Sequence, residues 1–452
     1  MYIRFTVQLF TQNLLVGIVA TSFTGKFYRP NSEYTHALKR AGVFLRSSNR
    51  DIFELSREWS KCFQIWNQGN YALATKTRIA ILEEVYSRNK IEDNYFPPIL
   101  SDQFFGPIGH HAFTGIHAAA QDLDLIPTGK RIGIVKPEML RNNFVALYKN
   151  RINYVNYAEG TGWTELPNNW HLTERMQMIR GNQGFIECFD LVDRVFGVNT
   201  VSRDNPFYVC DNNYIEDSKK LLRSFGFGDS DWFVGLHIRN GSLTPELRNQ
   251  SILNYIPAIK EITKMGGWVI RIGGREMPLL PKMERVIDLV AEENAAKHLH
   301  LFVLSACRFF IGTHSGPSWF PSLFGVPTIF TNHIAIGRCA LIFSENSFTL
   351  PKSAIKRDGS YASLMEILNS PFGFGELTLR EFAKEGLLIQ ENTPEELKNA
   401  ILEMFSRISG QTLPREDQLN RNVSQVREQF PWTSKGLISH SYLITNERRF
   451  LN

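Results

Sequence analysis

The stretch FVGLHIRNGS, residues 233–242, decides the fold prediction, because an apolar run of strand length passes directly into polar residues. A strand that only fills a core does not usually end in a histidine, an arginine, an asparagine and a glycine. Parallel α/β sheets bind their ligands beyond the carboxyl ends of their strands, and Arg239 follows such an end. Its planar, charged guanidinium suits phosphate oxygens. Taken alone, the stretch is equally compatible with a surface arginine in a salt bridge.

Downstream of residue 229, short apolar runs alternate with helical stretches. Strands are expected at residues 232–238, 267–273, 298–304, 307–313 and 326–330, and helices at residues 251–265 and 281–297. This alternation predicts a parallel sheet with right-handed crossovers. Further strands are expected earlier, at residues 131–137, 152–157 and 206–210. Two such units in series predict an α/β fold of two facing domains with a cleft between them.

The N-terminal part of the chain lacks this alternation and reads as helical. We therefore expect a helical module at residues 1–95, an α/β domain at residues 96–225 and a second at residues 226–452 that ends in a helical tail. The segment from Phe5 to Phe23 is apolar over about the length of a membrane span, although amide side chains interrupt it. A helix packed on its own protein, a helix in a membrane surface and a true span are all open for it.

Composition narrows the class of protein. With 452 residues, 43% of them hydrophobic and 21% charged, the chain is expected to fold as more than one soluble domain. A net charge of +5 suits an anionic partner. No run of Lys and Arg interleaved with aromatics supports nucleic-acid binding. The five cysteines are scattered and odd in number, which favours the cytoplasm over a disulfide-forming compartment.

A second stretch, FFIGTHSGPSWFPSLFGVPTIF at residues 309–330, reads as strand, small-residue loop, short helix and strand. Pro317 stands where proline favours the start of a helix. Exposed N–H groups at that start, together with neighbouring hydroxyls, predict a seat for a diphosphate. A plain turn between strand and helix is the alternative. The candidate residues in this loop are Thr313, His314, Ser315, Gly316 and Ser318.

Two further stretches supply candidates for a ligand site. Gly273 and Gly274 end the strand in VIRIGG, where backbone groups could contact a nucleobase or ribose. In GPIGHHA, His110 and His111 follow a glycine-rich turn, and one of them is expected to face the cleft. A histidine there could remove a proton from an acceptor hydroxyl, although a structural or orienting role is as plausible.

The sequence lacks the motifs of several other kinds of chemistry. The two Asp-x-Asp triplets, at residues 122–124 and 229–231, do not follow strands, and no His/Cys/Asp cluster has the spacing of metal ligands. We expect no catalytic metal and no bound cofactor. A Walker loop, a Gly-x-Ser-x-Gly elbow and a good dinucleotide fingerprint are also missing, which disfavours NTPases, α/β-hydrolases and nucleotide-sugar epimerases.

Taken together, GPIGHHA, GLHIRNGS, GGWVIRIGG and residues 309–330 resemble a family of bacterial glycosyltransferases found with surface-polysaccharide genes. The His-x-Arg strand end also resembles the fucosyltransferase superfamily, which includes protein O-fucosyltransferases. The resemblance covers roughly residues 97–332. It implies a GT-B architecture, in which two Rossmann-like domains face each other, the first binding the acceptor and the second a nucleotide sugar, usually without metal.

The resemblance also implies roles for single residues. In the fucosyltransferase relatives the arginine of His-x-Arg holds the β-phosphate of the donor, and Arg239 matches it, while His237 matches the motif histidine. The relatives often continue with charged residues, whereas Asn240-Gly241-Ser242 follow here, which leaves the sugar open, GDP-fucose being one candidate. His237 and Asn240 thus join the donor-binding candidates.

The expected function is transfer of a sugar from a nucleotide-diphosphate donor to a hydroxyl of a glycan, lipid-linked glycan or peptide. We expect inversion at the anomeric carbon without a metal ion. Arg239 would stabilise the leaving diphosphate. The base would be His110 or His111, or the reaction would use no side chain as base. Such an enzyme of polysaccharide biosynthesis would work in the cytoplasm, either free or held peripherally on the inner face of the membrane. The alternative is a non-catalytic module that binds nucleotide sugars or carbohydrate on the same fold.

Overall fold

The computed structural model describes most of the chain from residue 99 onward. The described residues are Ile65, scattered positions between Leu73 and Glu83, and the ranges 99–100, 108–126, 132–135, 143–156, 178–182, 184–241, 246–334, 343–370, 379–414, 416–430 and 433–451. The segment from Phe5 to Phe23 and most of the expected N-terminal module lie outside them. Ile65 and the described positions between Leu73 and Glu83 are helical.

The chain divides into two compact units. One comprises Met1–Pro98 and Trp163–Glu187, and the other comprises Ile99–Gly162 and Cys188–Asn452. The expected domain boundary between residues 225 and 226 falls inside the second unit, so the three-domain division stays a prediction. In the first unit, β4 (Met178–Gly181) and β5 (Gly184–Glu187) form an antiparallel hairpin, and Gly184 supplies the positive φ of +109° that its turn requires.

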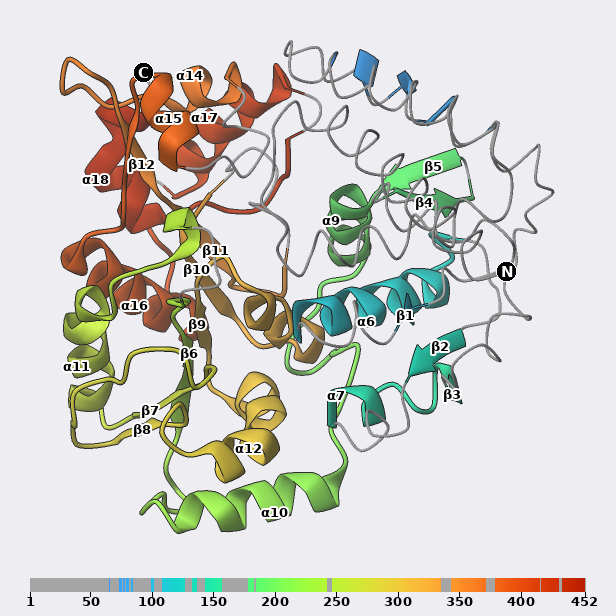
Figure 1. The fold of residues 1–452 in the computed structure, drawn as a ribbon. Helices are drawn as coiled ribbons and strands as arrows, with labels where there is room; N and C mark the ends of the chain where they lie inside the picture. The colour runs from blue at the N-terminus through green and yellow to red at the C-terminus, as the bar shows by residue number, and fades with distance from the viewer. Residues whose placement is uncertain are drawn as a thin grey trace, which may run out of the picture. The chain divides into compact units, whose positions relative to one another are not determined.

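The second unit is built around a six-stranded parallel sheet (Figure 1). Its strands are β6 (Phe233–His237), β7 (Trp268–Arg271), β8 (Val286–Asp288), β9 (Phe310–Gly312), β10 (Thr328–His333) and β11 (Phe348–Pro351). They lie in the order β11-β10-β9-β6-β7-β8, and every neighbouring pair is parallel. The predicted α/β class with a parallel sheet is confirmed.

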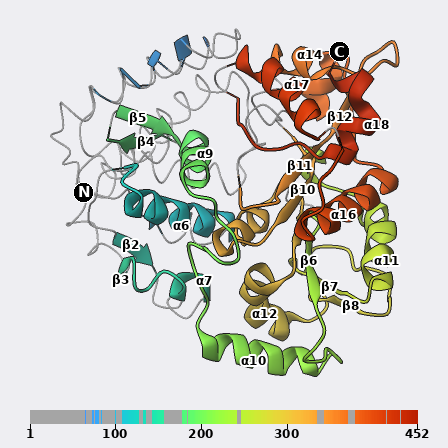
Figure 2. The ribbon, with the colours of Figure 1, turned by 180° about the vertical axis from the view of Figure 1, so that it is seen from behind.

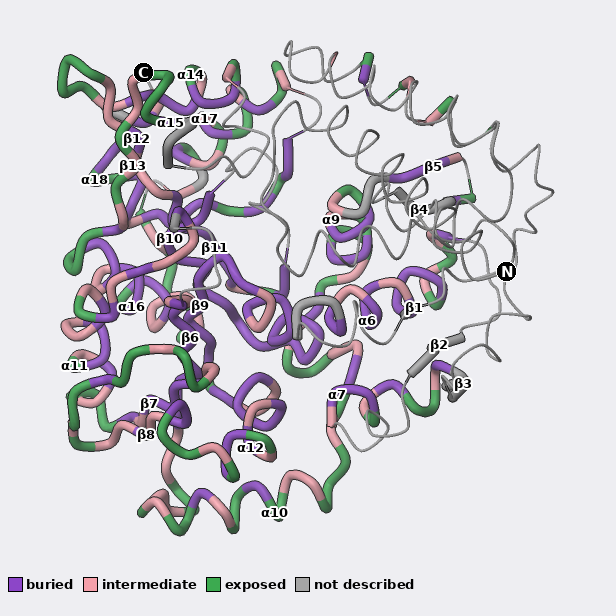
Figure 3. Tube along the Cα trace, viewed as in Figure 1, coloured by how far each residue is buried: buried purple, intermediate pink, exposed green. Residues whose placement is uncertain are grey.

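Helices cover both faces of this sheet. In the two opposite views, α11 (Ile256–Lys264), α16 (Pro394–Ile408) and α18 (His440–Phe450) lie on one side and α12 (Glu293–Ala306) on the other (Figures 1 and 2). All five residues of β6 are buried, and the central strands are buried along their length (Figure 3). Strands covered on both faces read as continuous apolar runs, which is why residues 233–236 lack alternation.

The spacing of apolar residues in α16 explains how it packs. Leu397, Ala400, Ile401 and Met404 are buried in the same core as Val269 and Ile329 of the sheet. Positions i, i+3, i+4 and i+7 share one face of an α-helix, so this face is turned to the strands. Thr393 caps the helix, accepting from the Glu396 N–H while the Glu396 carboxylate accepts from the Thr393 N–H.

The second unit contains further described elements besides this core. A three-stranded parallel sheet has the order β1-β2-β3, with β1 (Ile99–Leu100), β2 (Ile132–Val135) and β3 (Asn153–Asn156). The helices are α6 (Ile108–Asp122), α7 (Asn143–Ala146), α9 (Cys188–Val198), α10 (Asn212–Arg223), α14 (Leu364–Leu368), α15 (Leu379–Lys384) and α17 (Glu416–Glu428). An antiparallel pair joins β12 (Ser353–Ile355) and β13 (Leu388–Gln390), and short 3₁₀ helices are η2 (Glu246–Arg248), η3 (Ile252–Tyr255), η4 (Gly316–Trp319) and η5 (Pro321–Phe324).

The predicted helix at residues 281–297 and strand at residues 298–304 are wrong. The chain instead forms β8 at Val286–Asp288 and then α12 at Glu293–Ala306. Residues 298–304, HLHLFVL, look alternating, but Leu299, Phe302 and Val303 are buried at helical spacing. The strand predicted at residues 206–210 is absent as well, because Phe207 and Tyr208 both donate to the Leu323 carbonyl oxygen rather than to a neighbouring strand.

Candidate functional site

The order of the sheet singles out one place on its carboxyl edge. Along the chain, β6 is followed outward by β7 and β8, after which β9 returns to the other side of β6. This is the doubly wound arrangement. The loops after β6 and β9 diverge from the topological switch point, the place at which the strand order reverses and ligands of such sheets bind. His237 of β6 pairs in register with Gly312 of β9, so the residues after each meet at that point.

Backbone hydrogen bonds hold the loops after β6 and β9 together. Thr313 donates its N–H to the His237 carbonyl oxygen over 3.2 Å, and Arg239 donates its N–H to Thr313 Oγ1 over 3.0 Å. On its other side, the Arg239 carbonyl accepts from the Gln250 N–H over 2.9 Å. The Arg239 side chain is half-buried. A guanidinium at the switch point is therefore carried on a fixed stretch of backbone, where the sequence predicted it.

The loop after β6 closes on itself. Asn240 donates from Nδ2 to the Gln250 carbonyl over 2.9 Å, and Asn249 exchanges two hydrogen bonds with the backbone of Gly241. The amide nitrogen of Asn240 thus has a structural partner, and its predicted contact with a donor stays a prediction. Residues 242–245, including Ser242, lie outside the described ranges.

The small-residue loop after β9 is tightly packed. A Cβ added at Gly312 would lie 2.1 Å from Ser318 Oγ and 2.7 Å from Ser318 Cβ, so only glycine fits there. Ser318 is fully buried and donates its hydroxyl to the Thr313 carbonyl over 2.7 Å. Instead of the expected helix starting at Pro317, two 3₁₀ turns follow, η4 and η5. Turns this short carry little macrodipole, so a phosphate seat here would depend on individual N–H groups.

Those N–H groups are present at the switch point. Within the described part of the chain, the backbone N–H groups of Ser315, Gly316, Gly273 and Gly274 donate to no other group. The first two belong to the loop after β9, and the glycines follow β7 on the other side of β6. Backbone N–H donors without an internal acceptor, placed at neighbouring strand ends, suit the oxygens of an anion.

His237 occupies the space between these loops and is almost fully buried. Its Nδ1 lies 3.2 Å from the Ile272 carbonyl oxygen and its Nε2 lies 3.0 Å from Ser315 Oγ. Burial, the largest cause, and the positive charges of Arg271 and Arg239 together lower the pKa of His237 to about 3. The histidine is therefore neutral at physiological pH and connects the strand ends of β6, β7 and β9.

The arginines of the β7 stretch have internal partners. Arg271 is fully buried and donates from Nη1 to Asp288 Oδ2 over 3.0 Å and to the Pro278 carbonyl over 2.7 Å. Arg275 is mostly exposed and pairs with Glu293. A Cβ at Gly273 would lie 2.8 Å from both Met277 Sδ and Val290 Cγ2, which fixes the path of the loop after β7.

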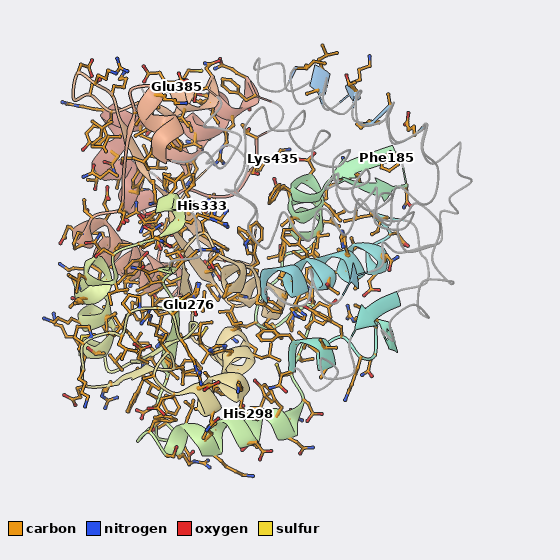
Figure 4. The ribbon with its side chains drawn as sticks, viewed as in Figure 1. Phe185, Glu276, His298, His333, Glu385 and Lys435 are labelled. Carbon is orange, nitrogen blue, oxygen red and sulfur yellow. The ribbon has the colours of Figure 1, made fainter. Side chains whose placement is uncertain are left out.

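Sequence reasoning missed residues at the carboxyl end of β10. The His333 ring stacks on that of His314, with centroids 4.7 Å apart and planes 15° apart, and both side chains are buried. Figure 4 labels His333 beside the strand ends. Asn332 has a positive φ of +53° and exchanges two 2.6 Å hydrogen bonds with Asn392. The available signal was the polar ending of TIFTNH, which resembles the ending of β6.

The two histidines proposed as bases lie in α6. His111 has 1% of its surface exposed, its ring lies 5.8 Å from that of Phe144, and its carbonyl accepts from the Tyr148 hydroxyl. This enclosure disfavours His111 as a group that meets an acceptor. The His110 side chain lies outside the described atoms. The helix itself contacts η4, where Phe113 and Trp319 have ring centroids 5.2 Å apart.

No protein-family model matches this chain, and no curated protein matches it. Its fold was also compared with solved structures. It is similar to a glycosyl transferase family 9 protein from Veillonella parvula DSM 2008, with 12% identity over 58% of this chain and 88% of that chain and a TM-score of 0.37. The E. coli ADP-heptose LPS heptosyltransferase II shows 8% identity over 68% and 98% of the two chains and a TM-score of 0.38. The iron-containing dodecameric glycosyltransferase TibC from enterotoxigenic E. coli H10407 shows 12% identity over 70% and 78% and a TM-score of 0.36.

All three of these solved structures are of glycosyltransferases. Across the described ranges, no three or more His, Cys, Asp or Glu side chains gather as a metal site would require. None of the described helices is long and apolar enough to cross a membrane.

Proposed function

We propose that the protein is a glycosyltransferase that moves a sugar from a nucleotide-diphosphate donor to a hydroxyl of a glycan, lipid-linked glycan or peptide. The observation that carries the proposal is the position of Arg239 at the topological switch point, fixed by its backbone hydrogen bonds to Thr313 and Gln250. An arginine there offers a charged fork for the leaving diphosphate. The identity of the sugar stays open, GDP-fucose being one candidate.

The neighbouring N–H groups support the same proposal. The loop after β9 presents the Ser315 and Gly316 N–H groups close to the strand end that carries Arg239. The Gly273 and Gly274 N–H groups flank β6 on the other side, where they would contact a ribose or base. Fixed cations and N–H groups stabilise charge that builds on a departing phosphate without a metal ion, which is the metal-independent course proposed here.

For the acceptor half of the reaction, we propose His110 as the general base. It stands one residue before the enclosed His111 in α6, and α6 contacts the η4 turn that follows the proposed phosphate seat. The base would take the proton of the acceptor hydroxyl as its oxygen attacks the anomeric carbon from the face opposite the diphosphate. The new glycosidic bond forms while the bond to the diphosphate breaks, which inverts the anomeric centre. Replacement of His110 by Ala is expected to lower turnover by about 10²-fold or more while donor affinity is kept.

A thermal-shift screen against GDP-, UDP-, dTDP-, ADP- and CMP-linked sugars, with EDTA present, tests the donor site. A ligand that binds only the folded state raises the melting temperature by mass action. We expect one nucleotide class to stabilise the wild type and the Arg308→Ala variant, but not the Arg239→Ala variant. Arg308 is a matched control because it lies before β9, at the opposite edge of the sheet, where its guanidinium stacks on Trp232.

An assay for release of the nucleoside diphosphate from the bound donor distinguishes an enzyme from a binding module. Turnover in the wild type that Arg239→Ala lowers by about 10²-fold or more supports the transferase. Binding without any release, with and without added glycan acceptors, would favour the non-catalytic alternative. Stabilisation of Arg239→Ala equal to that of the wild type would contradict the proposed donor site.

A further inference from the structure

The hydrogen bonds around His237 determine which way the Ser315 hydroxyl points. The Ile272 carbonyl oxygen, 3.2 Å from Nδ1, can only accept, so Nδ1 carries the ring proton. A neutral imidazole then has a lone pair on Nε2, which lies 3.0 Å from Ser315 Oγ. The Ser315 hydroxyl must therefore donate to His237. Its oxygen keeps lone pairs and can offer a ligand only an acceptor.

The surroundings of His237 keep it neutral. Its side chain is buried, with 2% of the residue exposed, and the groups that act on its charge are two arginines and another histidine. Arg239 lies in the loop after β6 and Arg271 ends β7, while His300 approaches from α12. Each disfavours a positive charge on the ring. Burial, the largest cause, and these neighbours lower the pKa of His237 to about 3, so the donor–acceptor pattern holds over the physiological range.

The Thr313 hydroxyl has the opposite pattern. Thr313 Oγ1 accepts from the Arg239 N–H over 3.0 Å, so its own proton stays available for donation. Ser318 donates its proton to the Thr313 carbonyl and is fully buried. Of the three hydroxyls in this loop, only that of Ser315 is committed to a histidine. The sequence expectation that Ser315 donates to a diphosphate does not fit this geometry.

We propose that Ser315 is a specificity residue that accepts a hydrogen bond from a hydroxyl group of the nucleotide sugar, with His237 as the positioning residue that fixes this polarity. The inference rests on the proposed donor site. Phosphate oxygens at neutral pH only accept, so they cannot pair with an oxygen whose proton is already used. A ribose or sugar hydroxyl can donate, and pairing of that kind rejects analogues that lack the hydroxyl.

The ligand-free protein provides the first test, which does not depend on donor binding. With ¹⁵N-labelled histidine, long-range ¹H–¹⁵N correlation spectra report which ring nitrogen carries the proton. The resonance of His237 is assigned by its loss in His237→Gln. We expect the Nδ1–H tautomer from pH 8 to pH 6. An Nε2–H tautomer or an imidazolium in this range would overturn the proposal, whatever the protein binds.

Binding measurements then test the ligand group. Dissociation constants are measured by calorimetry at pH 8 for ADP, GDP and UDP, their 2′-deoxy and 3′-deoxy forms, the nucleotide sugars and inorganic diphosphate. Ser315→Ala is expected to weaken binding of the hydroxyl-bearing ligand by about threefold to tenfold, the usual effect of one hydrogen bond. The deoxy form that lacks this hydroxyl, and inorganic diphosphate, should bind both proteins equally. Ser315→Thr keeps the oxygen and should restore affinity.

Comparison of the dissociation constants of the free nucleotides with those of the nucleotide sugars shows which part of the ligand supplies the hydroxyl. If the ribose supplies it, the loss in Ser315→Ala appears with the free nucleoside diphosphate. If the transferred sugar supplies it, the loss appears only with the nucleotide sugar. Donation by Ser315 to phosphate would require a proton on His237 Nε2, gained either from solvent or by transfer from Nδ1, which would leave Nδ1 unprotonated against the Ile272 carbonyl. Equal weakening of inorganic diphosphate, or a proton taken up on binding in buffers of different ionisation enthalpy, would therefore contradict the proposal. If no nucleotide binds the wild type, the proposed function fails, and the tautomer measurement alone decides the polarity of Ser315.

Discussion

Arg239 leaves the sheet with its backbone held on both sides, by Thr313 and by Gln250, while its side chain stays half-buried. Replacement by Ala should therefore change the chemistry much more than the fold. We expect a loss of about 10²–10³-fold in turnover, with the melting temperature of the ligand-free protein lowered by no more than a few degrees. The turnover of Arg239→Lys should lie between that of the wild type and that of Arg239→Ala, because lysine keeps the charge and loses the planar fork. Turnover of Arg239→Ala near that of the wild type would contradict this role.

Asn392 is predicted to be important for stability rather than for chemistry. Its side chain accepts from the Asn332 N–H and donates to the Pro351 carbonyl, and it is buried. Asn392→Ala leaves these groups unpaired and releases the left-handed backbone at Asn332, so the free energy of unfolding should fall by about 2–4 kcal/mol. Urea denaturation measures this loss. A change below about 0.5 kcal/mol would show that water replaces the lost partners.

For single residues, the sequence predicted the positions of the candidates better than their roles. Arg239 and Ser315 were predicted on the ligand edge because both follow apolar strands, and the structure places both there. The inward role of His237 could not be predicted. Its partners are Ile272 and Ser315, which lie 35 and 78 residues away in the sequence. Only the pairing of β6 with β7 and β9 brings them together.

At the scale of elements, the loop between β9 and η4 depends on Gly312. An alanine Cβ would overlap Ser318 Oγ, which is hydrogen-bonded in place, so Gly312→Ala should cost about 1–3 kcal/mol and shift the residues after Thr313. Nucleotide affinity should fall as well. Gly266→Ala is the control, because Gly266 has a φ of +85° but open space around it, and it should cost about 1 kcal/mol without affecting affinity. Unchanged affinity in Gly312→Ala would mean that the loop does not contact the ligand.

Helices and strands were predicted correctly where the sequence fitted one pattern only. The predictions were wrong where the same residues fitted both a strand and a helix pattern. Residues 233–237 and 268–271 are short apolar runs between turn residues, and both are strands. Residues 298–304 satisfy strand alternation and helical spacing equally well, and packing selected the helix. The strand at Val286–Asp288 has only three residues, fewer than a sequence pattern needs for recognition.

The stability of the whole protein should depend on three histidines, the buried His237 and the half-buried His117 and His300. Burial lowers the pKa of His237 to about 3 and those of His117 and His300 to about 4. The unfolded chain therefore binds more protons below pH 6.5. The free energy of unfolding should fall as the pH drops from 6.5 toward 4, by about 1.4 kcal/mol per pH unit for each histidine.

Urea unfolding at a series of pH values measures this dependence, and His300→Gln is the informative variant. It should remove about one histidine's share of the slope between pH 6.5 and pH 4.5. A wild type whose stability is flat over this window would contradict the prediction. So would a His300→Gln slope equal to that of the wild type.

The parallel α/β class followed from the alternation of strands and helices along the chain. The order β11-β10-β9-β6-β7-β8 did not, because it depends on pairs such as Leu236 and Ile311, which are far apart in sequence. The same long-range pairing places Arg239 at the switch point. The sequence therefore predicted which strand ends carry the candidate site, but not how these strand ends are arranged next to one another.

The most direct test of the donor site is a crystal structure of the wild type with the nucleoside diphosphate that stabilises it. The phosphates are predicted at the carboxyl ends of β6 and β9, within about 2.7–3.1 Å of the Arg239 guanidinium and of the Ser315 or Gly316 N–H. Phosphates bound elsewhere, with Arg239 out of contact, would contradict the proposed donor site and with it the assignment of the leaving-group charge to this arginine.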